Sequence, residues 1–167
     1  MQDLYQIVDA RDTVVGAKPR NKIDFEKDYF RSSGLWLTNT KGQVLIAQRV
    51  LSKDKDPGKW GPAVGGTLEV GETYESNAHK EASEELGLTG VKLKMGPKMK
   101  VMSPRHCFCQ WFIANCDKTE NEFTLQTSEV EQVKWIDKDA LFEDVRINPE
   151  KYLPTMPLVL EALYPKS

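Results

Sequence analysis

A glycine-rich turn leads directly into a helix-forming stretch in residues 66–88, and this arrangement restricts the fold more than any other part of the chain. The segment reads GTLEVGETYESNAHKEASEELGL. Thr73 can cap a helix through its hydroxyl group, and Gly87 can end the same helix in the left-handed conformation that glycine adopts readily. The sequence therefore predicts a helix over residues 74–86, with an irregular turn before it.

Three glutamates of this helix share one face. With about 100° of rotation per residue, Glu81, Glu84 and Glu85 fall within about 100° of one another. Carboxylates held so close repel one another unless they spread into solvent or bind cations, and hard divalent ions such as Mg²⁺ or Mn²⁺ prefer oxygen ligands of this kind. A diphosphate substrate brings further oxygens to the same ions. The glycines of the turn let the backbone pass over the helix start and offer a carbonyl to the metal.

Residues 66–88 resemble the Nudix box, whose pattern is GX5EX7REUXEEXGU with U an aliphatic residue. Every defined position fits except two, because Lys80 stands in place of arginine and Ala82 fills the first aliphatic place. An exposed acidic helix is the alternative interpretation, since glutamates at this spacing are common on solvated surfaces. The spacing across both a glycine loop and a helix favours the Nudix interpretation.

The rest of the chain predicts strands and two further helices. An N-terminal hairpin is expected from residues 4–8 and 13–17, and a second hairpin from residues 35–38 and 44–48. Further strands are expected at residues 91–95, 99–102, 108–114 and 133–136. Asp137 is expected to cap a short helix. A last helix is expected from Thr155, docked on the core through Leu158, Leu160 and Leu163.

This order of elements implies an α+β protein, and the resemblance implies a Nudix-type α/β/α sandwich with a mixed sheet. We expect a single domain over residues 1–167, with residues 1–30 as an N-terminal hairpin extension and residues 65–88 as the Nudix box.

Composition limits the partners. A net charge of −2 gives no electrostatic case for binding DNA, RNA or an anionic membrane. No apolar run approaches the length of a membrane span, and the polar start MQDLYQ does not resemble a signal peptide, so a cytoplasmic enzyme is expected. Its partner would be a small-molecule diphosphate, and the sequence leaves a homodimer open. The three cysteines are interpreted as reduced structural thiols, with a redox role as the alternative.

The resemblance implies roles for individual residues. Glu84 and Glu85 would be the main metal ligands, with the Gly65 carbonyl as a further one. Glu81 would bind a metal or act as general base on the attacking water. Glu72 would hold the loop and the helix in register without touching the ion itself.

Lys80 is the main chemical departure from the family pattern. Arginine at this position orients a catalytic glutamate through two parallel hydrogen bonds, which lysine cannot form. Lys80 is therefore expected to orient that carboxylate more loosely. The alternative is that Lys80 simply pairs with Glu84 four residues further along the helix.

Further candidates lie outside the box. Glu129 and Glu131 are candidates for an additional acidic ligand, with a solvated loop charge as the alternative for each. Basic residues near the end of one strand and in two loops could hold a phosphate group. These candidates for substrate binding are Arg49, Lys53, Lys59 and Arg105.

Two other functions compete with hydrolysis. The flanking sequences, including LIAQRVLSKDKDPGKW, resemble the Nudix branch that contains isopentenyl-diphosphate isomerase. In that enzyme a cysteine and a nearby histidine occupy the places of Gly65 and Thr67, and the two histidines of this chain cannot build its three-histidine metal site. A non-catalytic nucleotide-binding module would be expected to have lost its box glutamates. The sequence therefore favours metal-dependent hydrolysis of a phosphoanhydride bond in a nucleoside diphosphate or another diphosphate-linked metabolite.

Overall fold

The computed structural model describes residues 2–166, and within them the chain forms nine strands, three α-helices and three short 3-10 helices. In chain order the elements are β1 (Leu4–Val8), β2 (Val14–Pro19), η1 (Arg20–Lys22), β3 (Tyr29–Thr38), β4 (Gln43–Arg49), β5 (Trp60–Pro62), β6 (Val64–Thr67), α1 (Tyr74–Leu86), β7 (Lys94–Val101), β8 (Cys107–Asn115), η2 (Glu120–Glu122), β9 (Val130–Asp137), α2 (Lys138–Ile147), η3 (Pro149–Lys151) and α3 (Met156–Leu163).

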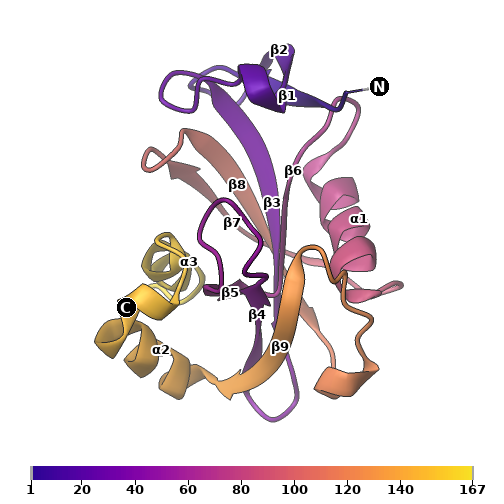
Figure 1. The fold of residues 1–167 in the computed structure, drawn as a ribbon, viewed down its shortest axis with the longest axis vertical. Helices are drawn as coiled ribbons and strands as arrows, with labels where there is room; N and C mark the ends of the chain where they lie inside the picture. Colours follow the sequence, from indigo (N-terminus) through magenta and orange to yellow (C-terminus); the bar gives the residue numbers. More distant parts are fainter. Residues whose placement is uncertain (1, 167) are drawn as a thin grey trace.

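Strand β3 is the centre of the sheet (Figure 1). It pairs antiparallel with β1, β4 and β6, and parallel with β8 along its whole length, from Phe30 opposite Cys107 to Thr38 opposite Asn115. Strand β2 extends the sheet beyond β1, β7 extends it beyond β8, and β5 and β9 both pair with β4. The sheet is therefore mixed and open.

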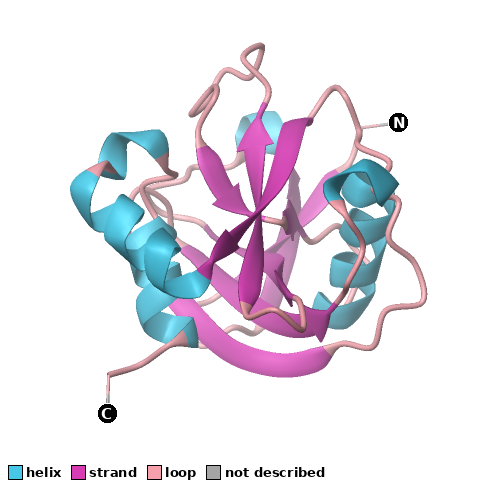
Figure 2. Ribbon diagram, turned by 90° about the horizontal axis from the view of Figure 1, so that it is seen from below, coloured by secondary structure: helices cyan, strands magenta, loops and turns pink. Residues whose placement is uncertain are grey.

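Side chains alternate between the two faces of the sheet, and each face is covered by helices (Figure 2). Leu35 and Leu37 on β3 pack with Ala82 of α1 in one buried cluster. Trp36 points to the opposite face, where it packs with Leu141 of α2 and Met156 of α3. The result is the α/β/α sandwich with a mixed sheet that the sequence predicts.

Helix α1 has the bounds that its sequence predicts. The Thr73 hydroxyl accepts a hydrogen bond from the Ser76 amide at 3.0 Å, and the Ser76 hydroxyl accepts one from the Thr73 amide at 2.9 Å. Gly87 closes the helix in the left-handed region, with φ of 62°. Both ends are thus fixed by local contacts, so the starting point of the carboxylate-bearing face is set before any distant packing is considered.

Three predictions about elements are wrong in detail. The strands expected at residues 91–95 and 99–102 are one strand, β7, because Gly96-Pro97 lies at a register shift between Met95 and Lys98 and makes no turn. Helix α2 does begin after Asp137, but without a hydrogen bond to its side chain. In α3, Leu160 and Leu163 pack on the core as predicted, but Leu158 is 45% exposed and Met156 and Val159 are buried in addition.

The cysteines lie where the sequence expects structural thiols. All three are free, and Cys107 and Cys109 are on β8. Burial raises the pKa of Cys107 to about 11 and that of Cys109 to about 12, against the effect of a hydrogen bond with Ser32. Thiols with such high pKa values carry little thiolate and react slowly. No helix between residues 2 and 166 is both long and apolar enough to cross a membrane.

The N-terminal hairpin is fastened to the rest of the protein through Asp12. This residue lies at the hairpin turn with φ of 64°, and its carboxylate accepts hydrogen bonds from three other elements. Arg31 of β3 donates at 2.7 Å, Lys98 of β7 at 2.6 Å and Tyr74 of α1 at 2.9 Å. Burial alone would raise the pKa of Asp12, but these three partners outweigh it and lower that pKa. Asp12 therefore joins the hairpin to the start of α1.

Replacing Asp12 by asparagine tests this junction, because asparagine tolerates a positive φ and removes only the charge. Asp12→Asn should lower the free energy of unfolding at pH 7 by about 2 kcal/mol. A carboxylate with a lowered pKa stabilises the fold above its unfolded pKa, so the difference should shrink as the pH falls below the ordinary aspartate pKa of 3.8 toward the lower pKa of the folded state. Urea titrations at several pH values measure this. Asp56→Asn, at the other non-glycine residue with positive φ, is the control, and an equal loss in both variants would contradict the role of Asp12.

Candidate active site

The three predicted glutamates of α1 differ in their surroundings. Glu84 is exposed, whereas Glu81 and Glu85 are partly buried. Burial raises the pKa of Glu81 to about 7, and the charges of Glu84, Glu72 and Glu69 add to that effect while Lys80 opposes it.

Glu85 has the stronger shift. Burial raises its pKa to about 8, and the charges of Glu81 and Glu129 add to it. Lys53 and Arg49 act in the opposite direction without cancelling these effects. Glu85 therefore lies near two acidic side chains, Glu81 and Glu129, and near two basic ones, Lys53 and Arg49.

The glycine turn lies against this helix face. A side chain at Gly66 would overlap the carboxyl group of Glu81, so a glycine is needed there for the helix and β6 to approach this closely. Gly65 precedes it in β6, opposite Gly34 of β3, and is exposed. The backbone that the sequence proposes as a carbonyl ligand thus runs beside the carboxylate-bearing face.

Lys80 does not pair with Glu84, so the alternative prediction of an i,i+4 pair is wrong. Its ammonium group lies 2.5 Å from Glu72 Oε1 and 3.3 Å from Glu69 Oε1. Glu72 also accepts hydrogen bonds from the Glu69 amide at 2.8 Å and from Asn77 Nδ2 at 2.9 Å. These contacts outweigh the effect of burial and lower the pKa of Glu72. Lys80 and Glu72 together hold the glycine turn on the helix.

Asn77 completes this clamp, and sequence reasoning missed it. The side chain is fully buried, with 0% exposure. It donates to Glu72 and to the Thr67 carbonyl at 3.2 Å, and it accepts from Ser33 Oγ at 2.5 Å. The signal was present, because a polar residue on the buried face of a helix requires partners. Identifying those partners required knowing that β3 and β6 lie beneath the helix.

Of the two downstream acidic candidates, the structure brings only Glu129 close to the helix face. Glu129 forms a 2.5 Å ion pair with Lys53, its carbonyl accepts from the Val50 amide at 3.2 Å, and its charge acts on Glu85. Glu131 lies exposed on β9, and no ion pair or side-chain hydrogen bond is found for it within residues 2–166. The acidic ligand candidate outside the box is therefore Glu129.

The basic candidates divide in the same way. The charges of Arg49 and Lys53 oppose the rise in the pKa of Glu85, so both side chains lie near the glutamate face of α1. The Lys59 carbonyl accepts a hydrogen bond from the Arg49 amide at 2.9 Å. The Lys59 ammonium group forms no ion pair among residues 2–166. Arg105 lies over the ring of Phe25, with 4.7 Å between the guanidinium carbon and the ring centroid.

The donor set fits a hard divalent ion in its chemistry. Every candidate ligand is a carboxylate or carbonyl oxygen, which Mg²⁺ and Mn²⁺ prefer. Burial and neighbouring carboxylates raise the pKa values of Glu81 and Glu85, and a bound cation would favour their charged forms. Within residues 2–166, however, no three acidic, histidine or cysteine side chains are gathered closely enough to hold an ion in this conformation.

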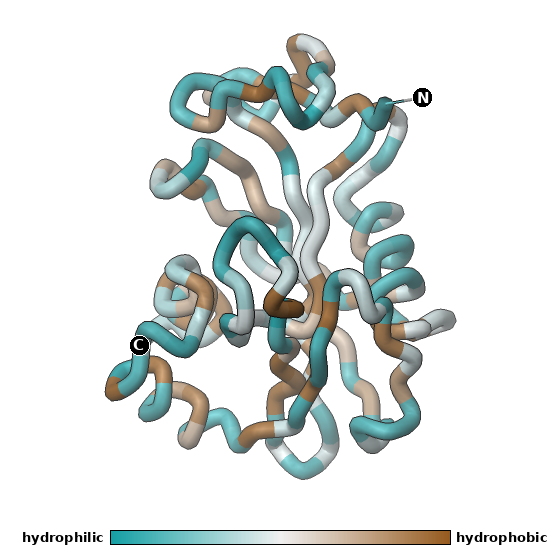
Figure 3. The backbone as a smooth tube through the Cα atoms, in the orientation of Figure 1, coloured by the Kyte–Doolittle hydropathy of each residue, from teal (hydrophilic) through white to brown (hydrophobic). Residues whose placement is uncertain are grey.

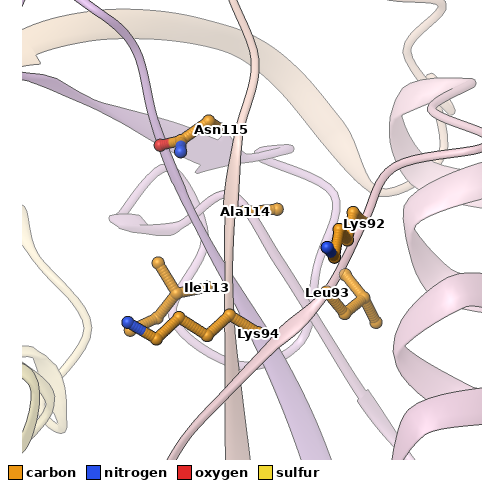
Figure 4. Close-up of a pocket in the computed structure, with 6 residues that line it drawn as sticks. All are labelled: Lys92, Leu93, Lys94, Ile113, Ala114 and Asn115. Carbon is orange, nitrogen blue, oxygen red and sulfur yellow. The ribbon is translucent and has the colours of Figure 1, made fainter.

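Surface hollows lie elsewhere. One of about 500 Å³ is bounded by β7, β8 and the residues before β7 (Figure 4), and Lys92 and Lys94 line it with none of the box glutamates. Another, of about 520 Å³, lies between the β1–β2 hairpin and the glycine turn, and Glu72 is the one box glutamate among its lining residues. The candidate site is thus defined by charge and contacts on α1 and its neighbouring loops.

Comparison with known proteins agrees with this architecture. Residues 28–156 match the model of the NUDIX domain. The chain is 30% identical over 162 residues to an uncharacterised Nudix hydrolase of Pseudomonas aeruginosa, covering 96% of this chain and 91% of that one. The chain therefore belongs to the Nudix family, and it is a Nudix hydrolase.

Other relatives refine the comparison. An isopentenyl-diphosphate Delta-isomerase of Rhodobacter capsulatus is 26% identical over 151 residues, covering 86% of this chain and 85% of that one, which confirms the resemblance of the flanking sequences to that branch. A crystal structure from Deinococcus radiodurans superposes with a TM-score of 0.85 at 23% identity, over 97% of this chain and 99% of that one. The fold is also shared by a bifunctional NMN adenylyltransferase/ADP ribose pyrophosphatase of Francisella tularensis, whose structure is complexed with AMP and a Mn ion. It superposes with a TM-score of 0.58 at 15% identity, over 84% of this chain and 42% of that one.

Glu85→Gln should stabilise the metal-free protein. The pKa of the folded carboxyl group is raised to about 8, whereas an exposed glutamate has a pKa of 4.5. In a chelating buffer the stability of the wild type should therefore fall as the pH rises through this interval. The variant should be more stable at pH 8 by on the order of 2 kcal/mol. Thermal melts from pH 5 to pH 8 measure this, with the exposed Glu84→Gln as control. A wild-type melting temperature independent of pH over this range would contradict the prediction.

Lys80→Gln should lower the free energy of unfolding by about 2 kcal/mol, because it leaves the carboxylate of Glu72 partly buried without a cation. Lys80→Arg should recover the stability, since a guanidinium can serve both Glu69 and Glu72. Urea denaturation compares these variants with Lys41→Gln, which alters an exposed lysine. If Lys80→Gln is as mild as that control, the clamp contributes nothing to stability.

Proposed function

We propose that the protein hydrolyses a phosphoanhydride bond in a nucleoside diphosphate or another diphosphate-linked metabolite, with Mg²⁺ or Mn²⁺ as cofactor. The observation that carries this proposal is the pair of partly buried carboxyl groups on α1, Glu81 and Glu85, next to the cations Arg49 and Lys53. Membership of the Nudix family supports the reaction class, and the Francisella tularensis neighbour, complexed with a Mn ion, supports the choice of metal.

The proposed roles follow from the resemblance of residues 66–88 to the Nudix box. Glu84 and Glu85 hold the metal with the Gly65 carbonyl, and Glu129 is the candidate ligand from outside the box. A bound divalent ion neutralises phosphoryl charge and lowers the pKa of a water molecule. Glu81 accepts a proton from the attacking water or serves as a further ligand.

The remaining residues position this machinery. Glu72 and Lys80 keep the glycine turn on the helix, which fixes the Gly65 backbone relative to the carboxylates. Arg49 and Lys53 bind the phosphate oxygens of the substrate, with Lys59 and Arg105 as further candidates. We propose that the whole chain, residues 1–167, acts as a single domain.

Two alternatives remain distinct from hydrolysis. An isomerase of the isopentenyl-diphosphate type needs a cysteine and histidines where this chain has Gly65 and Thr67, and the whole chain holds two histidines. A non-catalytic nucleotide-binding module does not require the box glutamates, yet Glu81, Glu84 and Glu85 are all present. Both observations favour hydrolysis.

Glu84→Gln should reduce metal-dependent kcat by about 100-fold or more, because loss of a ligand removes the charge that the metal needs. The assay follows phosphate and pyrophosphate release with Mg²⁺ and Mn²⁺ from nucleoside di- and triphosphates, nucleotide sugars, dinucleotides and prenyl diphosphates. Glu131→Gln is the matched control, since this exposed glutamate lies on β9 away from the helix, and it should keep nearly full activity.

Three results would count against the proposal. Activity of Glu84→Gln within about threefold of the wild type would remove the metal assignment. Conversion of isopentenyl to dimethylallyl diphosphate would establish the isomerase. Tight nucleotide binding without turnover of any diphosphate would establish the binding module.

A further inference from the structure

A group of cations surrounds one aromatic ring next to the proposed site. Phe25 lies in the segment between η1 and β3, with Lys55 Nζ 5.2 Å and the Arg105 guanidinium carbon 4.7 Å from its ring centroid. Arg49 reaches the same place, because its Nε donates to the Lys55 carbonyl at 3.0 Å. We call Arg20, Phe25, Arg49, Lys55 and Arg105 the Phe25 cluster.

The cluster is assembled from segments that are distant in the sequence. Lys55 belongs to the β4–β5 loop, which is strongly hydrophilic (Figure 3), and Arg105 to the loop between β7 and β8. The amide of His106 donates to the Phe25 carbonyl at 3.2 Å, which fixes the second loop against the Phe25 segment. His106 Nδ1 is also a buried atom without a hydrogen-bond partner among residues 2–166.

The four cations of the Phe25 cluster form no ion pair among the described residues, although the charge of Asp56 acts on Arg105. Within residues 2–166, none of Arg20, Arg49, Lys55 and Arg105 forms an ion pair within 4.0 Å. Lys53 in the same loop differs, because it is paired with Glu129. Burial, Arg20 and Arg49 all lower the pKa of Arg105. Cations that are close together and unpaired form a site for an anion.

The cluster is continuous with the proposed catalytic face. Arg49 belongs to both, since its charge acts on Glu85 while its side chain contacts the Lys55 backbone. The site therefore has an acidic end on α1, suited to metal ions, and a basic end at Phe25. A phosphate chain fits this arrangement with its cleaved bond near the carboxylates and another phosphate among the cations.

The basic end is built to recognise charge. Two cations lie over the Phe25 ring, which helps to hold them in place. An unsubstituted terminal phosphate has three free oxygens and approaches two negative charges above a pKa of about 6, whereas a phosphate esterified on both sides carries one charge. Guanidinium groups bind such oxygens in pairs.

We infer that the substrate carries an unsubstituted terminal phosphate, which the Phe25 cluster binds, and that diphosphates esterified at both ends are poor substrates. This inference rests on the proposed function. For a nucleoside diphosphate, water attacks one phosphorus and the bridging P–O bond breaks, which yields a nucleoside monophosphate and orthophosphate. The proton lost by the water is taken up at the carboxylate face.

The test compares ADP with ADP-ribose, which share the adenosine diphosphate group and differ in whether the outer phosphate is free. The wild type with Mg²⁺ should show a kcat/KM at least about tenfold higher for ADP. Arg105→Gln should raise KM for ADP about tenfold, and its loss with ADP-ribose should be several-fold smaller. Arg146→Gln, at an exposed arginine of α2 paired with Glu143, should behave as the wild type.

Three outcomes would overturn the inference. The wild type could prefer ADP-ribose, or Arg105→Gln could lose activity toward both substrates equally, or it could lose activity toward neither. Thermal melts confirm that the variant is folded. If the protein hydrolyses neither compound, the wider substrate panel decides the proposed function, and calorimetric binding of ADP and ADP-ribose with Ca²⁺ decides the inference separately. Tighter binding of ADP that is lost in Arg105→Gln supports the cluster, whereas equal binding of the two nucleotides removes it.

Discussion

The carboxylate face of α1 depends on the buried polar clamp beneath it. Ala78, Ala82 and Leu86 bury the apolar side of α1 against the sheet, whereas charge repulsion along its glutamate face works against close packing. Asn77 meets this difficulty by bonding to Ser33 and Thr67 from a fully buried position. Lys80 and Glu72 then tie the preceding turn to the same helix. The rotation of α1 about its axis, and with it the direction of every box glutamate, follows from these contacts.

Both ends of α1 could be predicted at the correct residue, because the signals that set them are local. Thr73 and Gly87 determine its ends through contacts within a few residues, so no knowledge of the fold was needed. The same kind of reasoning failed at Gly96-Pro97, where two turn-forming residues lie inside a strand because β8 holds both sides of the irregularity. Local propensity is decisive only where tertiary pairing does not compete with it.

The site shows the same division. The type and spacing of the glutamates could be read from the sequence, but the partner of Lys80 could not. Glu84 is its neighbour along the helix, yet Glu69 and Glu72 are brought to it by the glycine turn and offer a less exposed position. Phe25 and Lys55 are also unremarkable in the sequence, since only the meeting of their loops with Arg105 makes them a unit. Long-range contacts of this kind lie beyond pattern and propensity.

The parallel pairing of β3 with β8 has a consequence for how the chain folds. Thr38 and Asn115, which face each other and share a hydrogen bond, are 77 residues apart in the sequence. Closing a loop of this size costs entropy before any contact is gained, and proteins dominated by such distant pairings cross higher kinetic barriers. Helix α1 lies inside this loop and can form early through its own caps. Its glutamates therefore meet the loops that complete the site only late in folding, so an incompletely folded chain is expected to be inactive.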